Sequence, residues 1–287
     1  MKMRGTGFLF VLSCLLMMLC AAPEAAAETA GVFPDSPVSR HVPEPTVVTQ
    51  IETGKWVKKN GYYYYYRGKK KLKKGIYEIG SRKYCFDKKG RQLTGWRKVG
   101  KKVYYFRCKN GKKGYMLTGQ EVNGIRLKKT GRAAPKSERA KRKLKILLRA
   151  RKIADKAVRP TMKKKAKLRA CFEYVQKYYR SFVMEELGNS KGSWDLNYAE
   201  YMMDHGGGDC YGYAYLFAYL AVSIGCKDVL CVNNGMHGWA EIDGKFYDPH
   251  WDLWIKVDCF ATPASESGTG GRPHWVGHRH NIKNCDK

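Results

Sequence analysis

Three residues in the last third of the chain, Cys210, His237 and Asp248, have the types and spacing that a nucleophilic reaction needs. Cys210 stands in the run Gly-Gly-Gly-Asp-Cys-Tyr-Gly-Tyr at 206–213, which opens an apolar stretch over 214–225 that predicts a helix. His237 and Asp248 lie on two segments that read as paired strands. A thiol beside an imidazole that is oriented by a carboxylate is an activated nucleophile. We therefore expect these three side chains to meet.

The predicted helix would place the cysteine favourably. A cysteine at the start of a helix lies at the positive end of the helix dipole, which favours the thiolate. Asp209 is expected to cap that helix. If the thiol attacks a carbonyl, the backbone N–H of Cys210 is expected to donate to the resulting oxyanion. Trp194 and Tyr201 are the candidates for a second donor.

The predicted hairpin would bring the histidine and the acid together. Asp243-Gly244 is a strong two-residue turn signal. With that turn, Trp239 lies opposite Asp248, and His237 shares their face because strand side chains alternate. His237 and Asp248 are then diagonal neighbours, roughly 7–8 Å apart at the backbone, which a carboxylate can bridge.

Two other residues compete with Asp248 for the orienting role. In the same register, His250 would sit directly opposite His237. Pro249 should disturb the strand at that point, so Asp248 is favoured over His250. Asp252 is a weaker substitute.

These stretches resemble the transglutaminase-like superfamily, which shares the papain-like Cys-His-Asp arrangement. The matching segments are the lead-in helix at 165–179, Gly-Asp-Cys at 208–210, His-Gly-Trp at 237–239 and the ending Asp-Gly-Lys-Phe-Tyr-Asp-Pro at 243–249. The resemblance implies an α+β, papain-like catalytic domain over 161–258. It implies Cys210 as nucleophile, His237 as base and Asp248 as orienting acid, with no cofactor. The implied reaction cleaves or transfers an amide through an acyl-thioester.

A second module is predicted over residues 54–132, where aromatic segments and Gly-containing turns recur about every 20 residues. The pattern indicates an all-β stack of hairpins that precedes the catalytic domain. With its Trp and Tyr starts and Leu-Thr-Gly-Trp at 93–96, it resembles the cell-wall-binding repeats of the choline-binding and glucan-binding type. Seven aromatics are candidates for wall binding, the alternative being core packing: Trp56, Tyr64, Tyr77, Tyr84, Trp96, Tyr104 and Tyr105.

Charge separates the two modules. Residues 54–132 hold 26 Lys and Arg against 3 Asp and Glu, whereas residues 171–287 hold 10 against 15. The basic module is expected to bind an anionic cell-wall polymer, such as a teichoic acid, a glycan or peptidoglycan, or to be a solvated basic face. Nucleic acid is a poor fit, because no nucleic-acid-binding fold is recognisable and the chain is expected to be exported.

The remaining segments complete the predicted organisation. Residues 1–27 have the basic start, apolar core and Ala-Ala-Ala site of a signal peptide, so we expect a secreted, wall-associated protein without a stable membrane span once the signal is cleaved; a retained anchor is the alternative. Residues 28–53 are a predicted linker and 133–160 a basic linker helix. Residues 259–287 are a predicted tail, whose His274, His278 and His280 could bind zinc but are favoured as part of a mobile or partner-binding segment.

The cysteines leave two alternatives open. Export permits disulfides, and Cys85 with Cys108 and Cys259 with Cys285 are the pairings considered. Buried free thiols are the other alternative.

Together these observations predict an exported cysteine enzyme that acts on a protein or peptide amide, as a protease, amidase or acyltransferase, and that is held on the wall by its repeats. The alternative is a non-catalytic adhesin or scaffold in which the transglutaminase-like fold survives only as a binding surface.

Overall fold

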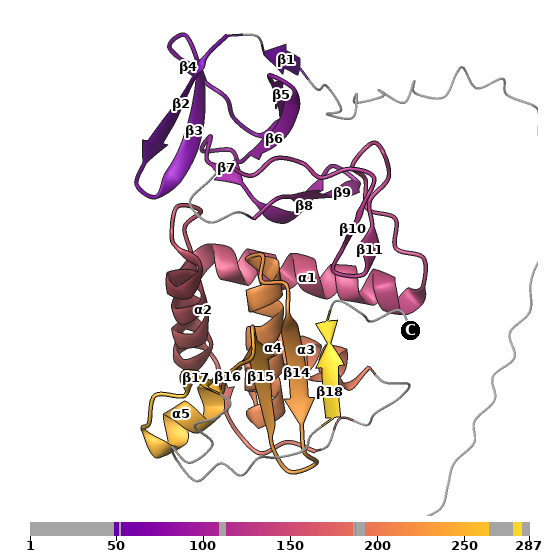
Figure 1. The fold of residues 1–287 in the computed structure, drawn as a ribbon, viewed down its shortest axis with the longest axis vertical. Coiled ribbons are helices and arrows are strands. Elements are labelled where there is room, and N and C mark those ends of the chain that lie inside the picture. Colours follow the sequence, from indigo (N-terminus) through magenta and orange to yellow (C-terminus); the bar gives the residue numbers. More distant parts are fainter. Residues whose placement is uncertain are drawn as a thin grey trace, which may run out of the picture. The chain divides into compact units, whose positions relative to one another are not determined.

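The computed structural model describes residues 49–51, 53–108, 113–185, 187, 193–263 and 278–282, and Figure 1 labels its elements. The chain divides into two units, Met1–Val42 and Pro43–Lys287, and all described residues belong to the second. The predicted signal peptide, most of the predicted linker, His274 and Cys285 lie outside the described residues. No described helix combines the length and apolar character that crossing a bilayer would require.

The predicted hairpins are confirmed in the N-terminal half of the described chain. Their turns suit two-residue hairpins, since Asn60-Gly61 and Asn123-Gly124 all have positive φ. Hairpins form between β2 and β3, β5 and β6, β8 and β9, and β10 and β11, while β1 joins β5 in parallel. The strands are β1 (Thr49–Ile51), β2 (Lys55–Lys59), β3 (Tyr62–Arg67), β4 (Lys70–Lys71), β5 (Gly75–Ile79), β6 (Arg82–Phe86), β7 (Gln92–Leu93), β8 (Gly95–Val99), β9 (Lys102–Phe106), β10 (Glu121–Val122) and β11 (Ile125–Arg126).

Helices and a five-stranded antiparallel sheet make up the rest, so the fold is α+β with small hairpin sheets first. The sheet order is β17-β16-β15-β14-β18, and β12 and β13 form a separate parallel pair. The helices are α1 (Glu138–Ala157), α2 (Lys164–Tyr178), α3 (Trp194–His205), α4 (Cys210–Ser223) and α5 (Pro249–Ile255). The strands are β12 (Arg180–Ser181), β13 (Gly207–Gly208), β14 (Val229–Asn233), β15 (Gly238–Ile242), β16 (Lys245–Tyr247), β17 (Phe260–Pro263) and β18 (His278–Asn281).

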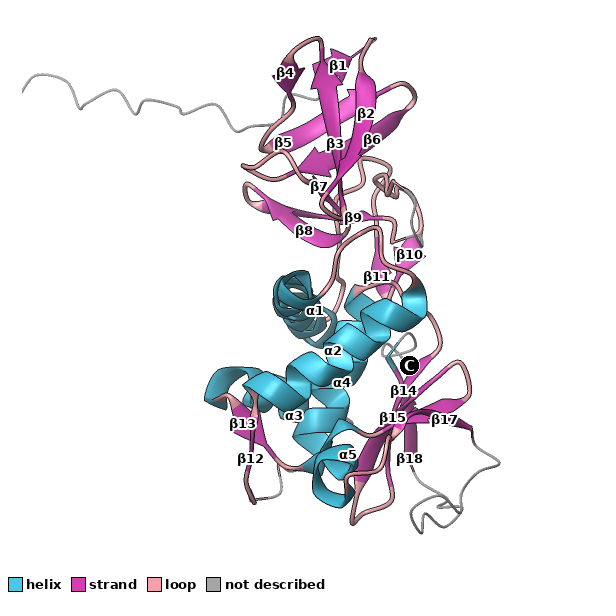
Figure 2. Cartoon of the chain, turned by 90° about the vertical axis from the view of Figure 1, so that its left-hand side faces the viewer, coloured by secondary structure: helices cyan, strands magenta, loops and turns pink. Residues whose placement is uncertain are grey.

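Helix α4 is the centre of this part. Residues 212–223 are all buried, as expected for a helix that is apolar on every side. Helices α1, α2 and α3 pack against it, and so do strands β14 and β15. Figure 2 shows α1 between the hairpins and the remaining helices.

Helix α1 corrects the expectation of a linker helix. Its apolar side is fully buried with Trp96 and Tyr105 of the third hairpin in the same core as α4. Arg97 of β8 also forms a bidentate ion pair with Asp155 of α1. Dense Lys and Arg hid this in the sequence, because long basic side chains can occupy the remaining faces while a narrow apolar stripe is buried.

Two further expectations are corrected. The Cys85 and Cys108 thiols are both free: Cys85 packs with Phe106 and Met116, whereas the Cys108 thiol lies 3.8 Å from the Ser223 carbonyl oxygen at the end of α4. The predicted tail contributes both edge strands of the sheet, β17 and β18, which are too short to show an alternating pattern.

Candidate active site

Cys210 is the first residue of α4, and glycines let neighbouring chains approach it. Asp209 is the N-cap, since its carboxylate accepts from the N–H of Gly212 at 3.1 Å. A Cβ on Gly238 would lie 2.5 Å from the Tyr211 ring, so only glycine allows the start of β15 to touch the first turn of α4. A Cβ on Gly207 would lie 2.3 Å from the Arg180 carbonyl oxygen, so the glycine run also lets β12 pair beside the thiol.

His237 and Asp248 lie at the same end of one hairpin. The predicted turn is confirmed, since Ile242 pairs with Lys245. Each residue lies one position outside its strand, with His237 just before β15 and Asp248 just after β16. His237 Nε2 is 2.6 Å from Asp248 Oδ2, and the Asp248 residue is 1% exposed. The other carboxylate oxygen accepts from the Trp251 N–H at 2.8 Å, which caps α5 and fixes the rotamer.

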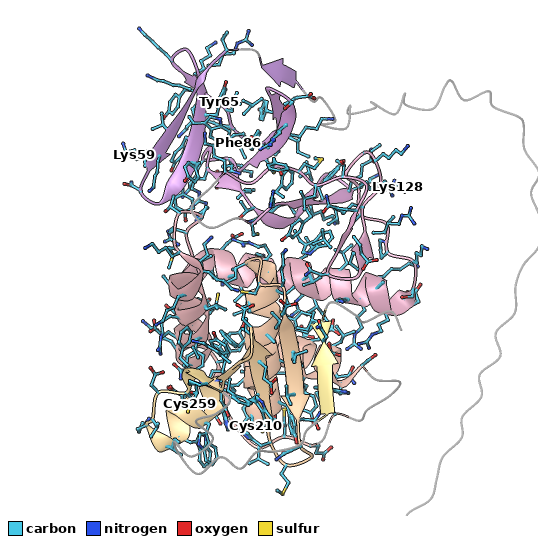
Figure 3. The ribbon with its side chains drawn as sticks, in the orientation of Figure 1. Lys59, Tyr65, Phe86, Lys128, Cys210 and Cys259 are labelled. Carbon is cyan, nitrogen blue, oxygen red and sulfur yellow. The ribbon has the colours of Figure 1, made fainter. Side chains whose placement is uncertain are left out.

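The imidazole also hydrogen-bonds the Cys210 thiol. Because Asp248 is bonded to Nε2, we assign the hydrogen bond with the thiol to the other ring nitrogen, Nδ1. Burial by itself would lower the pKa of His237, but the hydrogen bonds and charges of Asp248 and Cys210 outweigh it and raise the pKa from 6.5 to about 10. The site therefore holds an imidazolium at neutral pH, between a carboxylate and a thiol, as an activated cysteine requires. Figure 3 labels Cys210 at the end of α4 that lies away from the hairpins.

Two neighbours of His237 were not anticipated from the sequence. Asn234 Oδ1 accepts from the N–H groups of Met236 and His237, at 3.0 and 2.7 Å, and so holds the loop that carries the imidazole. Asn-Asn-Gly at 233–235 is a turn signal that could have pointed to it. The Trp251 ring packs edge-on against His237 with 5.5 Å between centroids. No sequence pattern marks Trp251, because it reaches the site through the α5 turn.

His250 does not take the place that the strand register gave it. The strand ends at Tyr247, and Pro249 begins α5, so His250 lies on a helix. There its Nε2 is 2.7 Å from the Ser181 hydroxyl. Asp252 is also engaged elsewhere, because it accepts from the Gln176 side chain and from the Cys259 N–H.

The oxyanion donors stay predictions. Among the described residues, no acceptor is within hydrogen-bond distance of the Cys210 N–H, as expected at the first residue of a helix. Trp194 begins α3 and packs on Tyr215 with 4.9 Å between ring centroids. Tyr201 stacks on His205. Within the described ranges, no cluster of His, Cys, Asp or Glu side chains has metal-binding geometry.

Most wall-binding candidates on the hairpins are core residues. Trp96 is 1% exposed, and Tyr84, Tyr104 and Tyr105 are buried, so a polymer cannot reach their rings. The repeat pattern could not separate these from accessible aromatics, because both roles need the same side chains at the same places. Trp56, Tyr64 and Tyr77 stay partly accessible.

Two of these accessible rings, those of Trp56 and Tyr64, are each covered by a lysine of the same chain. Lys113 Nζ lies 4.8 Å from the centre of the Trp56 ring, which itself packs edge-on against Tyr65 and Tyr84. The Tyr64 ring is covered in the same way by Lys71, at 5.0 Å. An aromatic face occupied by an internal ammonium is less available to an external quaternary ammonium.

Comparisons with known proteins concern the hairpin region. No curated protein matches the chain. Similar solved structures include the modular Cpl-1 endolysin complexed with a peptidoglycan analogue, at 27% identity over 29% of this chain and 25% of that chain, with a TM-score of 0.25. CbpJ from Streptococcus pneumoniae TIGR4 has 27% identity over 29% and 30%, with a TM-score of 0.25. Choline binding protein F from Streptococcus pneumoniae, in the presence of a peptidoglycan analogue, has 25% identity over 29% and 35%, with a TM-score of 0.22.

The chain spans between a quarter and about a third of the length of these structures. The family match falls within the second and third hairpins and the segment after them. Residues 73–114 match the choline-binding repeat family.

Proposed function

We propose that the chain is a wall-associated cysteine enzyme of transglutaminase-like type that cleaves or transfers amide bonds. One observation carries the proposal: His237 hydrogen-bonds both Asp248 and Cys210, and Cys210 begins a helix. A structural cysteine needs none of these partners, whereas an acyl-transferring thiol needs all of them.

The proposed reaction runs through an acyl-thioester. The Cys210 sulfur attacks the amide carbonyl while its proton resides on His237, and Asp248 holds the ring in the matching orientation. The Cys210 N–H, with a second donor for which Trp194 is our candidate, stabilises the oxyanion. As the carbon–nitrogen bond breaks, His237 gives its proton to the leaving amine. Water then completes hydrolysis, the reaction we favour, and a lysine amine would complete transamidation instead.

The substrate class is suggested by apolar side chains that border the thiol. Among the described residues, Val183 is 98% exposed, Met236 83% and Trp254 69%. Val183 follows β12, which pairs with the glycines before Cys210, and Met236 directly precedes His237. Trp254 packs against His250, which hydrogen-bonds Ser181 of β12. A peptide with apolar side chains next to the scissile amide would cover this surface.

The repeats are proposed to hold the enzyme on the cell wall. The choline-binding repeat match at 73–114 supports a wall-binding role. Within the repeats, Lys113 covers the Trp56 ring and Lys71 covers the Tyr64 ring. Residues 54–132 also contain 26 basic side chains and only 3 acidic ones. This arrangement suits an anionic polymer of the teichoic acid kind better than a choline headgroup.

The test is the rate at which iodoacetamide alkylates Cys210, measured against pH by peptide mass spectrometry. We expect fast labelling well below pH 8, and slow labelling in His237→Ala. His205→Ala is the matched control, since His205 lies on the exposed end of α3 and should leave the rate unchanged. Labelling at the rate of an ordinary thiol in both the native chain and His237→Ala would instead favour a non-catalytic adhesin built on the same fold.

A further inference from the structure

A cavity of about 590 Å³ lies where the hairpins meet the helical part, away from Cys210. Its wall is formed by the end of β9, by β10, by the first turn of α2 and by the connection from α4 to β14. Four cationic side chains line it, from Arg107, Lys164, Lys167 and Lys227, against one carboxylate, that of Glu121. Lys164 is already paired with Asp243, which lies outside the lining. The cavity is of the size that takes a small organic ligand, and its lining keeps a net positive charge.

Lys167 is the unusual member of this lining. Three basic side chains are buried among the described residues, those of Lys143, Arg151 and Lys167. Lys143 donates to the Ile282 carbonyl oxygen, and Arg151 pairs with Asp155. Lys167 is 6% exposed, yet no described residue offers its Nζ a carboxylate or another acceptor within hydrogen-bond distance. An ammonium buried without a partner is costly, and burial lowers the pKa of Lys167 accordingly.

Nearby thiols do not supply the missing negative charge. Cys108 lines the same cavity, but its thiol donates to the carbonyl oxygens of Phe106 and Ser223. Cys171 and Cys226 also lie near Lys167, but burial raises the pKa of each to about 12. Both are therefore neutral at physiological pH. The charge of Arg151 also acts on the Lys167 ammonium and repels it. Among the described residues, no carboxylate is paired with this ammonium, so an anion that enters the cavity would meet an uncompensated positive charge.

Other polar groups in the cavity are arranged to assist an anion. Asn123 uses its Oδ1 to accept from the Trp96 indole at 3.0 Å, which leaves its amide N–H groups as donors. One nitrogen of the Arg107 guanidinium donates to the Tyr115 hydroxyl, and its remaining N–H groups can donate to an anion. The same cavity has an apolar side, which is formed by Leu117, Val122 and the Tyr115 ring.

We propose that this cavity binds the phosphoryl group of a small phosphorylated organic ligand, seated on Lys167. A phosphate monoester carries up to two negative charges, which matches several converging cations better than a single carboxylate does. The organic part lies on the tyrosine and aliphatic wall, since the volume exceeds that of a bare phosphate. The site is independent of the proposed thiol chemistry, because it lies at the other end of α4 from Cys210.

The test measures ligand-dependent thermal stabilisation and calorimetric binding of the full chain at constant ionic strength. The probes are inorganic phosphate, glycerol 3-phosphate and a glycerol phosphate polymer, with acetate as the carboxylate control. We expect phosphate and glycerol 3-phosphate to raise Tm and acetate to have little effect. Tighter binding of the polymer than of glycerol 3-phosphate would identify a wall polymer as the source of the phosphoryl group, and the reverse order would identify a free phosphate ester.

Lys167→Met separates a binding site from a structural lysine. Removing a buried unpaired charge should raise Tm without ligand, while phosphate affinity falls at least tenfold. Lys152→Met, on the exposed side of α1, should change neither. Should Lys167→Met fold poorly, Lys227→Ala at the exposed mouth should still weaken phosphate binding about threefold. Phosphate stabilisation that survives unchanged in Lys167→Met, or that is absent from the native chain, would overturn the proposal. The alkylation rate of Cys210 should stay unchanged in these variants, so failure of the phosphate site would leave the proposed thiol chemistry untouched.

Discussion

Asp248→Asn tests the central electrostatic argument with the smallest change of shape. The amide oxygen can still accept from the Trp251 N–H and cap α5, but the charge that faces His237 is removed. The difference between a pKa of 6.5 and one of about 10 corresponds to roughly 5 kcal/mol of preference for the imidazolium, at 1.36 kcal/mol per pH unit. Asp248 and Cys210 both contribute to that preference, and a hydrogen bond to a charged group is worth about 1.5–3 kcal/mol, so we expect the carboxylate to account for about 2 kcal/mol, or roughly 30-fold in an equilibrium.

The assay is again alkylation of Cys210 against pH. We expect Asp248→Asn to lower the rate between pH 6 and 7 by up to about 30-fold, because the thiolate–imidazolium pair loses the carboxylate that stabilises its cation relative to the neutral thiol and imidazole. Asp252→Asn is the matched control, since Asp252 lies on the same helix and bonds Gln176 and the Cys259 N–H instead of His237. An unchanged pH profile in Asp248→Asn would refute the claim that the carboxylate sets the charge of the imidazole.

The free energy of unfolding should also depend on pH through His237, and the direction of that dependence follows from its raised pKa. Because folding raises the pKa of His237 from 6.5 to about 10, its contribution is complete below pH 6.5 and is lost as pH rises towards 10. The difference in unfolding free energy between the native chain and Asp248→Asn should therefore be about 2 kcal/mol at pH 6 and should shrink steadily towards pH 10. Urea unfolding at several pH values measures it. A difference that grows with pH would contradict the assignment.

Three further perturbations test other parts of the fold. Lys113→Ala should uncover the Trp56 ring and strengthen choline binding several-fold by calorimetry, and an unchanged affinity would show that Lys113 does not block the ring. Gly238→Ala should clash with Tyr211, cost roughly 1–3 kcal/mol in urea unfolding, and slow alkylation of Cys210; a fully stable variant would contradict the close packing. Asp155→Asn should cost roughly 2–3 kcal/mol at neutral pH, because the shift of the Asp155 pKa from 3.8 to about 2 corresponds to that preference for a carboxylate beside Arg97 and Arg151. Burial by itself would raise the pKa of Asp155, but the two arginines outweigh it and lower the pKa to about 2. The loss of stability should therefore fade as the pH falls from 4 to 2, and a loss that persists in acid would contradict this assignment.

Local chemistry explains why the hairpins and the site could be predicted. Asn-Gly and Asp-Gly turns with positive φ fix hairpin registers within a few residues, so the pairing at the 243–244 turn follows from sequence alone. The start of α4 follows equally from Asp209, which caps it, and from the apolar run behind it. Each of these signals lies within one element and its cap.

Features that depend on distant segments could not be predicted. The position of His250 is a different case, because the hairpin register would continue the strand to this residue whereas two local signals, Pro249 and the Asp248 cap, start a helix there. The basic segment over 138–157 suggested a solvated linker, but Arg97 is 58 residues from the Asp155 that it binds. Such long-range pairs leave no periodic signal in one sequence, because either partner alone is an ordinary surface residue.

The path of α4 explains why one core unites the two halves of the described chain. At its first residue the helix presents Cys210, and beyond its last turn Gly225 meets Cys108, where a Cβ would lie 2.4 Å from that of the cysteine. Fourteen residues at about 1.5 Å each separate these ends by roughly 20 Å. A fully buried helix transmits displacement poorly unless its neighbours move with it, since packed interiors have few voids. Contacts at the hairpin end should therefore hold the helix in place, with Cys210 at the end of the helix that lies away from the hairpins.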